Sequence, residues 1–406
     1  MQPTVTVEQR VNAADEKTVT LRVARVEDMR RVQALYAEVY GPNYPLSIVS
    51  EKSRMRRAIE SSRYYWLVAV CEDRIIASLI YEMDPVQRLA KAFGAVVSKE
   101  FRKRDLANIM METAQKRFTR GRPMVDTVYA TTRTVTTAPQ KLTENLGFVK
   151  LGIFPNVHKV FEYETHCLAA YFAPEALKRR KKPAILIPEV APFYRLVCQQ
   201  IELGRPIFSQ PAAPLIERNQ NASHQEPLLS FEIISAPHFV RHRFEYLKKS
   251  GLFAASYVPF HEANLLFITP DQSTEVFLNH GAMDRYSVIL GGRTGSRDFS
   301  LILNSAAKTL NDMGVSYIEL LVDAYSPALQ RHAFNSRFIP CAYYPALRKV
   351  GGKRWDYIVF ARTFEMLDFR NVRITQTYRR FLKEYLKIWQ SLYIDSVFRD
   401  SSLKSS

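Results

Sequence analysis

The stretch from Ala92 to Phe118 constrains the fold more than any other part of the sequence. Ala92 to Val97 is a short apolar run that suits a buried strand, and the mostly basic stretch Ser98 to Asp105 follows it. From Leu106 onward, apolar residues recur at intervals of three and four positions, as on one face of a helix. The pattern predicts a strand, a basic turn and a helix. Because the first N–H groups of a helix are free and favour an anion, we expect a diphosphate to fit in this turn.

The charge balance bears on the kind of partner. The chain has 57 lysines and arginines against 40 aspartates and glutamates, a net charge of +17. Such an excess of positive charge is typical of proteins that meet an anion. It leaves open whether the anion is a nucleotide cofactor, an acidic carrier protein, nucleic acid or a lipid surface.

Length and composition indicate a soluble protein with two domains. The 406 residues are many for a single core, and the 47% hydrophobic and 24% charged fractions are those of globular proteins. No run approaches the roughly 20 apolar residues of a membrane span, and the first residues lack a signal-peptide pattern. We therefore expect a cytoplasmic protein without a transmembrane segment. The 4 cysteines have no C-x-x-C spacing, which predicts neither a disulfide framework nor a metal site.

The first half of the chain alternates predicted strands and helices. A strand, two helices and a hairpin precede the opening stretch, and a strand, a short helix and a closing strand follow it. These segments are, in order, 19–23, 26–40, 53–61, 66–71, 75–81, 125–134, 136–146 and 157–172.

Two motifs in this half resemble the GNAT acyltransferase superfamily. The first is V-S-K-E-F-R-K-R-D-L-A, which is similar to the coenzyme A signature of an apolar strand residue followed by R/Q-x-x-G-x-G/A. Arg102 and Ala107 match the two ends of that signature, and Asp105 stands in place of its first glycine. The second is A-P-Q-K-L-T-E-N-L-G-F, which resembles the helix that ends in glycine and phenylalanine before the last hairpin. The order of elements agrees with the resemblance.

The second half repeats this organisation. Predicted helices and strands follow one another at 237–249, 264–269, 275–279, 286–290, 299–310, 315–322 and 327–335, with a glycine-rich basic turn at 291–298. After the last short helix of each half, two aromatic residues are six positions apart, and a proline follows the second. They are Phe148 and Phe154-Pro155 in the first half, and Phe338 and Tyr344-Pro345 in the second. The repetition predicts two similar domains in tandem, an arrangement also seen in mycothiol synthases and N-myristoyltransferases.

The resemblance implies an α+β fold class: two tandem GNAT-like domains, each a mixed, mostly antiparallel sheet flanked by helices, plus a C-terminal helix. The predicted domains are 18–172 and 230–367. Between them, 173–229 is a linker with one docked helix and the basic run Lys178 to Lys182. The segment 368–400 is predicted to be a basic amphipathic helix, which suits a membrane or an acidic partner but more commonly packs on its own protein.

The resemblance also implies a cofactor, acetyl-CoA or another acyl-CoA, and residues to bind it. In the first half the implied cofactor-binding residues are Val97, Arg102, Lys103, Arg104, Asp105, Leu106 and Ala107. A weaker second site is predicted at Gly292, Arg293 and Gly295, since glycines in a turn let backbone amides converge on phosphates.

The catalytic side chains are less well defined by the sequence. Many GNAT enzymes use a tyrosine before the glycine-phenylalanine pair as general acid, and Thr143 occupies that place here. Tyr129 and Glu82 are the alternative acid and base, because a strand-end carboxylate can act directly or through water. His158 and His166 are further alternatives.

The leading hypothesis is an acyl-CoA-dependent N-acyltransferase, most simply an N-acetyltransferase, that acts by direct transfer to a small-molecule or peptide amine. A second hypothesis replaces CoA by an acidic acyl carrier protein, which the Lys178 to Lys182 run would suit. A third is a catalytically inactive GNAT-like pair that binds nucleic acid or a protein through its basic surface. The sequence contains no recognisable nucleic-acid module.

Overall fold

The computed structural model describes residues 7–9, 18–41, 46–121, 123–159, 163–210, 227–255, 258–295 and 298–395. Several predictions fall partly outside them: residues 160–162 of the predicted strand 157–172, 211–226 of the linker, 396–400 of the C-terminal helix, and Ser296 and Arg297 of the glycine-rich turn. The chain forms two compact units. The first unit comprises Met1–Thr132, Ala138–Val149 and Ala169–Lys178, and the second unit comprises Arg133–Thr137, Lys150–Leu168 and Arg179–Ser406.

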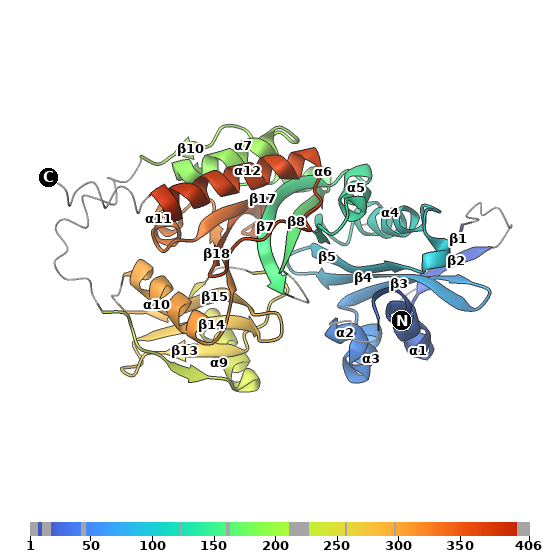
Figure 1. The fold of residues 1–406 in the computed structure, drawn as a ribbon, viewed down its shortest axis with the longest axis horizontal. Coiled ribbons are helices and arrows are strands. Elements are labelled where there is room, and N and C mark those ends of the chain that lie inside the picture. The colour runs from blue at the N-terminus through green and yellow to red at the C-terminus, as the bar shows by residue number, and fades with distance from the viewer. Residues whose placement is uncertain are drawn as a thin grey trace. The chain divides into compact units, whose positions relative to one another are not determined.

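The first unit is a sheet with helices on both faces (Figure 1). Its strands, in spatial order, are β1 (Val7–Gln9), β2 (Val19–Val23), β3 (Tyr64–Cys71), β4 (Arg74–Asp84), β5 (Leu89–Val97) and β6 (Thr127–Arg133). All neighbours are antiparallel except β5 and β6, which are parallel.

The helices of the first unit bury apolar stripes against opposite faces of this sheet. On one face lie η1 (Val26–Asp28), α1 (Met29–Tyr40), α2 (Ser47–Ser50) and α3 (Lys52–Glu60). On the other lie α4 (Leu106–Thr119) and α5 (Ala138–Asn145), with η2 (Lys99–Phe101) leading into α4. Residues on alternate positions of β4 therefore enter two separate cores, as the two-residue period of a strand requires.

The strands of the second unit are also mostly antiparallel. Its strands, in spatial order, are β7 (Val149–Lys159), β17 (Ile339–Val350), β18 (Lys353–Thr363), β16 (Tyr317–Asp323), β15 (Tyr286–Thr294), β14 (Thr274–Gly281), β13 (Leu265–Ile268) and β11 (Glu232–Ile234), and β8 (Tyr163–Phe172) lies beside β7. Only β15 and β16 are parallel among these neighbours.

Helices and two short strand pairs complete the structure. The helices are α6 (Pro174–Lys178), η3 (Pro188–Val190), α7 (Ala191–Cys198), α9 (Pro237–Lys249), α10 (Phe299–Asp312), α11 (Pro327–Asn335), α12 (Gln376–Gln390) and η4 (Ser391–Asp395). The short strands are β9 (Ile185–Leu186), which pairs with β10 (Ile207–Phe208), and β12 (Ala254–Ala255), which pairs with β15. The predicted fold class of mixed, mostly antiparallel sheets flanked by helices is confirmed, and α12 is the C-terminal helix.

In the first unit, a bulge ends the pairing of the two parallel strands. β5 and β6 pair from Leu89–Thr127 to Ala92–Ala130, and both strands then continue without pairing to each other. Two positions later, Gly94 has φ +62°. The register with β4 shifts at this glycine, so β5 carries an additional residue there. A bulge of this kind bends its strand, which turns β5 away from β6.

The second unit contains the same device. β15 and β16 pair from Tyr286–Tyr317 to Ile289–Leu320, again over four residue pairs, and both strands run on beyond that point. Two positions later, Gly291 has φ +135°, and the register with β14 shifts beside it. The two glycines thus occupy matching positions, each just beyond the end of a four-residue parallel ladder.

Other left-handed residues recur at matching places. Arg88 and Arg285 precede the bulged strands β5 and β15, and Gly147 and Arg337 follow the short helices α5 and α11. Asn156 and Ala346 lie within the long strands that come next, β7 and β17. In each half the phenylalanine after the short helix donates its N–H to the same position of that helix, Thr143 or Ala333. The geometric repeat follows the order of the sequence repeat.

The basic run Lys178 to Lys182 is not a free charged surface. Arg180 is buried and donates from Nε and Nη2 to the carboxylate of Asp356 on β18, at 2.8 and 2.5 Å. This carboxylate raises the pKa of Arg180, although burial acts in the opposite direction. Lys181 Nζ lies 3.7 Å from the ring centroid of Trp355. The prediction that the whole run suits an acidic partner is therefore wrong for its central residues.

Candidate functional site

A cavity of about 410 Å³ lies in the second unit where β15 and β16 separate. Its floor consists of the strand ends Gly291 to Thr294 and Leu320 to Asp323, and its sides come from α10 and α11. Most of the side chains are apolar: Phe299, Ile302, Leu303 and Ala306 from α10, and Ala328 and Leu329 from α11. We call this space the divergence cavity. It is suited to a ligand with an apolar body.

Gly292 explains why β15 adopts its course here. A Cβ atom on Gly292 would lie 2.3 Å from the carbonyl oxygen of Glu275 on β14, so only glycine fits. Gly291 and Gly292 pair with β14 on one edge of β15 and with β12 on the other edge. β12 therefore occupies the part of the gap between β15 and β16 that is nearest the parallel ladder, and the gap is open from Arg293 onward.

The second predicted cofactor turn is located differently from the expectation. Gly292 and Arg293 lie within β15, paired with Val276 and Glu275, and are not in a turn. Gly295 follows the strand and is exposed. The prediction of a turn at Gly291 to Thr294 is wrong because close approach to β14 demands glycine in an extended strand. Gly292 and Arg293 nevertheless line the divergence cavity.

A buried carboxylate with two arginines forms the polar wall of the divergence cavity. Glu275 is 3% exposed and accepts from Arg243 Nη2 at 2.9 Å. Arg293 Nε lies 3.4 Å from the other oxygen of the same carboxylate. Both arginines are about one-third exposed, at 31% and 35%. Asp323 also lines the cavity, so two carboxylates, Glu275 and Asp323, lie beside the two arginines.

A serine–histidine pair lies on the helix side of the cavity. His332 of α11 lines the cavity, and its Nδ1 is 2.7 Å from Ser300 Oγ on α10. Asp298 caps α10 by accepting from the Ser300 N–H at 2.5 Å, and its Oδ1 lies 3.4 Å from His332 Nδ1. The same ring nitrogen therefore faces both Ser300 Oγ and Asp298 Oδ1.

The first-unit turn has the backbone conformation expected of its glycine motif. Lys103 and Asp105 have φ values of +65° and +57°, in the left-handed region that favours glycine. Asp105 takes this conformation at the position where the signature has glycine, and its carboxylate accepts from Asn108 Nδ2. Arg102, Lys103 and Asp105 are exposed, whereas Leu106, the first residue of α4, is buried. The turn therefore presents its basic side chains to solvent.

The remaining predicted residues lie before, within and after this turn. Val97 is the last residue of β5 and packs against the core, and Ala107 lies in the first turn of α4. The guanidinium of Arg104 lies 5.1 Å from the ring centroid of Phe101, which is buried. Strand, turn and helix thus lie as predicted from the sequence.

A carboxylate braces the start of the turn. Glu38 Oε1 accepts from Ser98 Oγ at 2.8 Å and from the Lys99 N–H at 3.1 Å, and Arg74 Nη2 is 3.1 Å from Glu38 Oε2. Burial alone would raise the pKa of Glu38, but these hydrogen bonds and the arginine charge lower it overall. The ionised carboxylate holds the strand end in place.

Glu82 and Tyr129 lie on the same face of the first sheet but not in contact. In the strand register Glu82 is opposite Lys91, and Lys91 is opposite Tyr129. They are two strands apart, about 10 Å. Glu82 is engaged by Arg63 Nη2 at 2.7 Å and by Tyr64 Oη at 3.2 Å. Both residues lie beside Lys91, in the part of β5 that still pairs with β6 and precedes the bulge.

Thr143 and the two predicted histidines have other surroundings. Thr143 is buried and donates from Oγ1 to the carbonyl oxygen of Gln140 at 2.9 Å, inside α5. His158 and His166 lie in the second unit with ring centroids 5.1 Å apart, and His158 is also 5.1 Å from the ring of Tyr286. Tyr286 begins β15, whereas the divergence cavity lies at the other end of that strand.

Comparisons with known proteins give structural similarities only. No protein-family model matches the chain, and no curated protein matches it either. The ribosomal-protein-S18-alanine N-acetyltransferase from Escherichia coli is 17% identical over 38% of this chain and 94% of that one, with a TM-score of 0.32. An acetyltransferase of GNAT family from Streptococcus pneumoniae is 17% identical over 38% and 99%, with a TM-score of 0.34.

A ribosomal-protein-S5-alanine acetyltransferase from Vibrio fischeri is 15% identical over 42% of this chain and 98% of that one, with a TM-score of 0.35. These TM-scores are low, between 0.32 and 0.35.

Sequence reasoning missed Glu275, Ser300 and His332. The repeat contains one usable signal, because the position of Thr143 corresponds to Ala333, which is adjacent to His332. The ion pairs of Glu275 leave no local trace in the sequence, since Arg243 is 32 positions away.

Within the described part of the chain, no helix is both long and apolar enough to span a bilayer.

Proposed function

We propose that the chain is a GNAT-type acyl-CoA-dependent N-acyltransferase whose donor site is the divergence cavity. The observation that carries this proposal is the apolar cavity between two parallel strands that separate at a glycine bulge. β12 pairs with Gly291 and Gly292, so the edge of β15 that β16 leaves is open to an extended ligand with amides only beyond Gly292. The pantetheine arm of coenzyme A is an extended chain with two amide groups, so it suits this space.

The same reasoning supports a tandem organisation. The bulge glycines, the left-handed residues and the helix-to-strand hydrogen bonds recur in one order in both halves. We assign GNAT-like domains to 18–172 and 230–367 and a linker to 173–229. The first-unit turn, from Arg102 to Ala107, offers a second position for a diphosphate, but Asp105 brings a negative charge to it.

In the second unit, Arg293 and the start of α10 would receive the phosphates. Arg293 lines the cavity, and Arg243 pairs with Glu275 beside it. The first N–H groups of α10 carry the positive end of the helix dipole, although the Asp298 carboxylate already accepts from the Ser300 N–H there. Gly295 precedes them, and no atom of the described residues lies within 4 Å of the position that a Cβ atom would take there. The apolar residues of the cavity would then cover the pantetheine arm.

The transfer requires two proton movements. The amine nitrogen attacks the thioester carbonyl carbon, the C–N bond forms, the C–S bond breaks, and the nitrogen loses a proton while the thiolate gains one. We assign protonation of the thiolate to His332, which lines the cavity and is held by Ser300. For the first unit, Glu82 and Tyr129 remain the proposed base and acid.

Calorimetric titration with acetyl-CoA and with longer acyl-CoAs tests the donor. We propose acetyl-CoA as the simplest donor. Ala328→Trp would fill the mouth of the cavity from the exposed start of α11 and should weaken binding at least about tenfold. Asn311→Trp, on the exposed outer end of α10, is the matched control and should bind as the wild type does. Failure of the folded wild type to bind any acyl-CoA would overturn the proposal.

A further inference from the structure

The C-terminal helix α12 has one buried face and one exposed face of distinct chemistry. Tyr378, Phe381 and Tyr385 are fully buried, and Tyr378 Oη donates to the carbonyl oxygen of Leu168 at 3.1 Å. Phe381 packs against Phe193 of α7, with ring centroids 6.2 Å apart. The helix is therefore fixed to the second unit, and its exposed face is a rigid surface.

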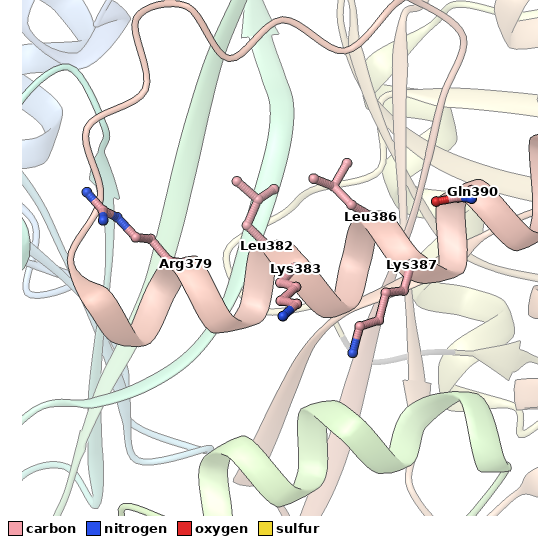
Figure 2. Close-up of a pocket in the computed structure, with 6 residues that line it drawn as sticks. All are labelled: Arg379, Leu382, Lys383, Leu386, Lys387 and Gln390. Carbon is pink, nitrogen blue, oxygen red and sulfur yellow. The ribbon is translucent and has the colours of Figure 1, made fainter.

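That exposed face combines a cationic row with two leucines. A shallow groove of about 330 Å³ runs along it, lined by Arg379, Leu382, Lys383, Leu386, Lys387 and Gln390. Figure 2 shows Leu382 and Leu386 on one side of the helix axis, and Lys383 and Lys387 on the other. Both rows have the four-residue spacing that places side chains above one another on a helix. We call these six residues the α12 groove.

The cations of this face are available to a partner. Among the described residues, no ion pair or side-chain hydrogen bond engages Arg379, Arg380 or Lys383. Lys387 is paired with Glu384 at 2.7 Å, and Glu384 is the sole acidic residue of α12. An unpaired cationic row that is not needed to hold the helix in place is suited to an acidic surface.

We propose that the α12 groove is the docking site for an acidic carrier protein that presents an acyl thioester. A row of leucines beside a row of cations matches a helix that carries an apolar row beside a row of carboxylates, since such a helix could lie along α12 and contact both rows. A carrier protein bears the same pantetheine thioester as coenzyme A, so this choice of partner rests on the proposed function. The charge match itself does not depend on it.

The groove is structurally linked to the divergence cavity. Tyr393, just after α12, donates from Oη to the carbonyl oxygen of Arg337 at 2.9 Å. Arg337 follows α11, which contributes Ala328 and His332 to the cavity. The segment that follows α12 is therefore joined to the residue that follows α11.

Two other anionic surfaces fit the α12 groove less well. A membrane-bound helix turns its large apolar side chains to the lipid, but those of α12 face the protein core. A nucleic-acid phosphate backbone makes no use of an apolar row, whereas Leu382 and Leu386 form one side of this groove.

Binding of the full chain to an immobilised holo acyl carrier protein without an acyl group tests the proposal. The wild type should bind, and binding should weaken as salt rises. Arg379→Glu with Lys383→Glu, and separately Leu382→Ala with Leu386→Ala, should each weaken binding at least about tenfold. Lys52→Glu with Arg57→Glu on exposed positions of α3 makes the same charge change elsewhere and should leave binding intact.

Circular dichroism of each variant checks that the chain remains folded, as expected for exposed or half-buried positions. Three outcomes would overturn the proposal: no binding by the wild type, equal binding by the α12 variants, or binding only to vesicles of phosphatidylglycerol or to an RNA oligonucleotide. Acyl-CoA titration of the same samples reports on the cavity separately. Loss of carrier binding with retained acyl-CoA binding therefore identifies a failure at α12 alone.

Discussion

His332 is the residue to which we assign protonation of the leaving thiolate. In the repeat, Ala333 corresponds to Thr143, and alanine cannot donate a proton. The imidazole one position earlier lines the cavity and is oriented by Ser300. A histidine held by a neighbouring hydroxyl is a common arrangement for a general acid.

We expect His332→Gln to lower kcat roughly 100-fold with an acyl-CoA donor, because glutamine keeps a hydrogen bond to Ser300 but exchanges no proton. A thioester of a more acidic thiol needs less help to depart, so the loss should shrink with such a donor. Steady-state kinetics with both donors measures the difference. Equal losses with the two donors would show that His332 has a structural role instead.

Glu164 makes stability of the second unit depend on pH. Burial alone would raise its pKa, but contacts with His166 and Arg133 lower the pKa of Glu164 to about 2. Its carboxylate is ionised in the folded chain at a pH where an unfolded glutamate, with a pKa of about 4.3, is half protonated. The contribution is therefore complete above the unfolded pKa and is lost as the pH falls toward 2.

We expect Glu164→Gln to remove this dependence. The free energy of unfolding should fall less between about pH 5 and about pH 3 in the variant than in the wild type. Denaturant titrations at the two pH values give the comparison. Glu60→Gln, on an exposed position of α3, is the control and should behave as the wild type does; identical pH slopes for Glu164→Gln and wild type would contradict the assignment.

The turn from Arg102 to Ala107 was predictable from sequence because its determinants are local. An apolar strand, a basic stretch and a periodic helix follow one another without a long-range contribution. Glu275 and His332 were not predicted, since their significance depends on Arg243, Arg293 and Ser300, which the fold brings to them.

At the scale of elements, β15 shows how tertiary contact overrides local preference. Glycine is disfavoured in strands, and two consecutive glycines predicted a turn at Gly291. The structure continues β15 to Thr294, because a side chain at Gly292 would collide with the backbone of β14. Helices 237–249 and 327–335 were predicted with the same bounds that the structure has, since proline fixes their start and a regular apolar stripe defines their length.

We expect Gly292→Ala to lower the free energy of unfolding of the second unit by about 2 kcal/mol, because the new methyl group would lie 2.3 Å from the Glu275 carbonyl oxygen. It should also weaken acyl-CoA binding by shifting β15. Gly295→Ala is the matched control: no described atom lies within 4 Å of its added Cβ, so its stability should remain within about 0.5 kcal/mol of wild type. Equal stability of both variants would mean that β14 and β15 adjust freely.

At the scale of the whole chain, the segment after the first half is tied into the second unit through a buried ion pair. Arg180 and Asp356 are 176 positions apart, and Asp356 also accepts from Tyr343 Oη and the Ala346 N–H. A basic run in a proline-rich segment gave no sign of this contact, because its partner carboxylate lies far along the chain. The resemblance carried by the two motifs, together with the repetition, predicted the fold class but not this attachment.

We expect Asp356→Asn to lower the free energy of unfolding by about 3 kcal/mol, since it leaves the Arg180 guanidinium buried without its counter-charge. Chemical denaturation measures the change. Asp312→Asn breaks an exposed pair with Lys308 and should change it by less than about 1 kcal/mol. A small effect at Asp356 would show that water or other groups compensate Arg180.

The two bulges also indicate where the chain tolerates changes in length. Gly94 lies eleven positions before the helix N-cap Asp105, but Gly291 lies only seven before Asp298, so the two halves already differ by four residues there. An insertion of one residue between Tyr286 and Gly291 would instead move every later side chain of β15 to the opposite face of the sheet. Deletions and duplications during evolution should therefore accumulate downstream of each bulge glycine and spare the four-residue ladder before it.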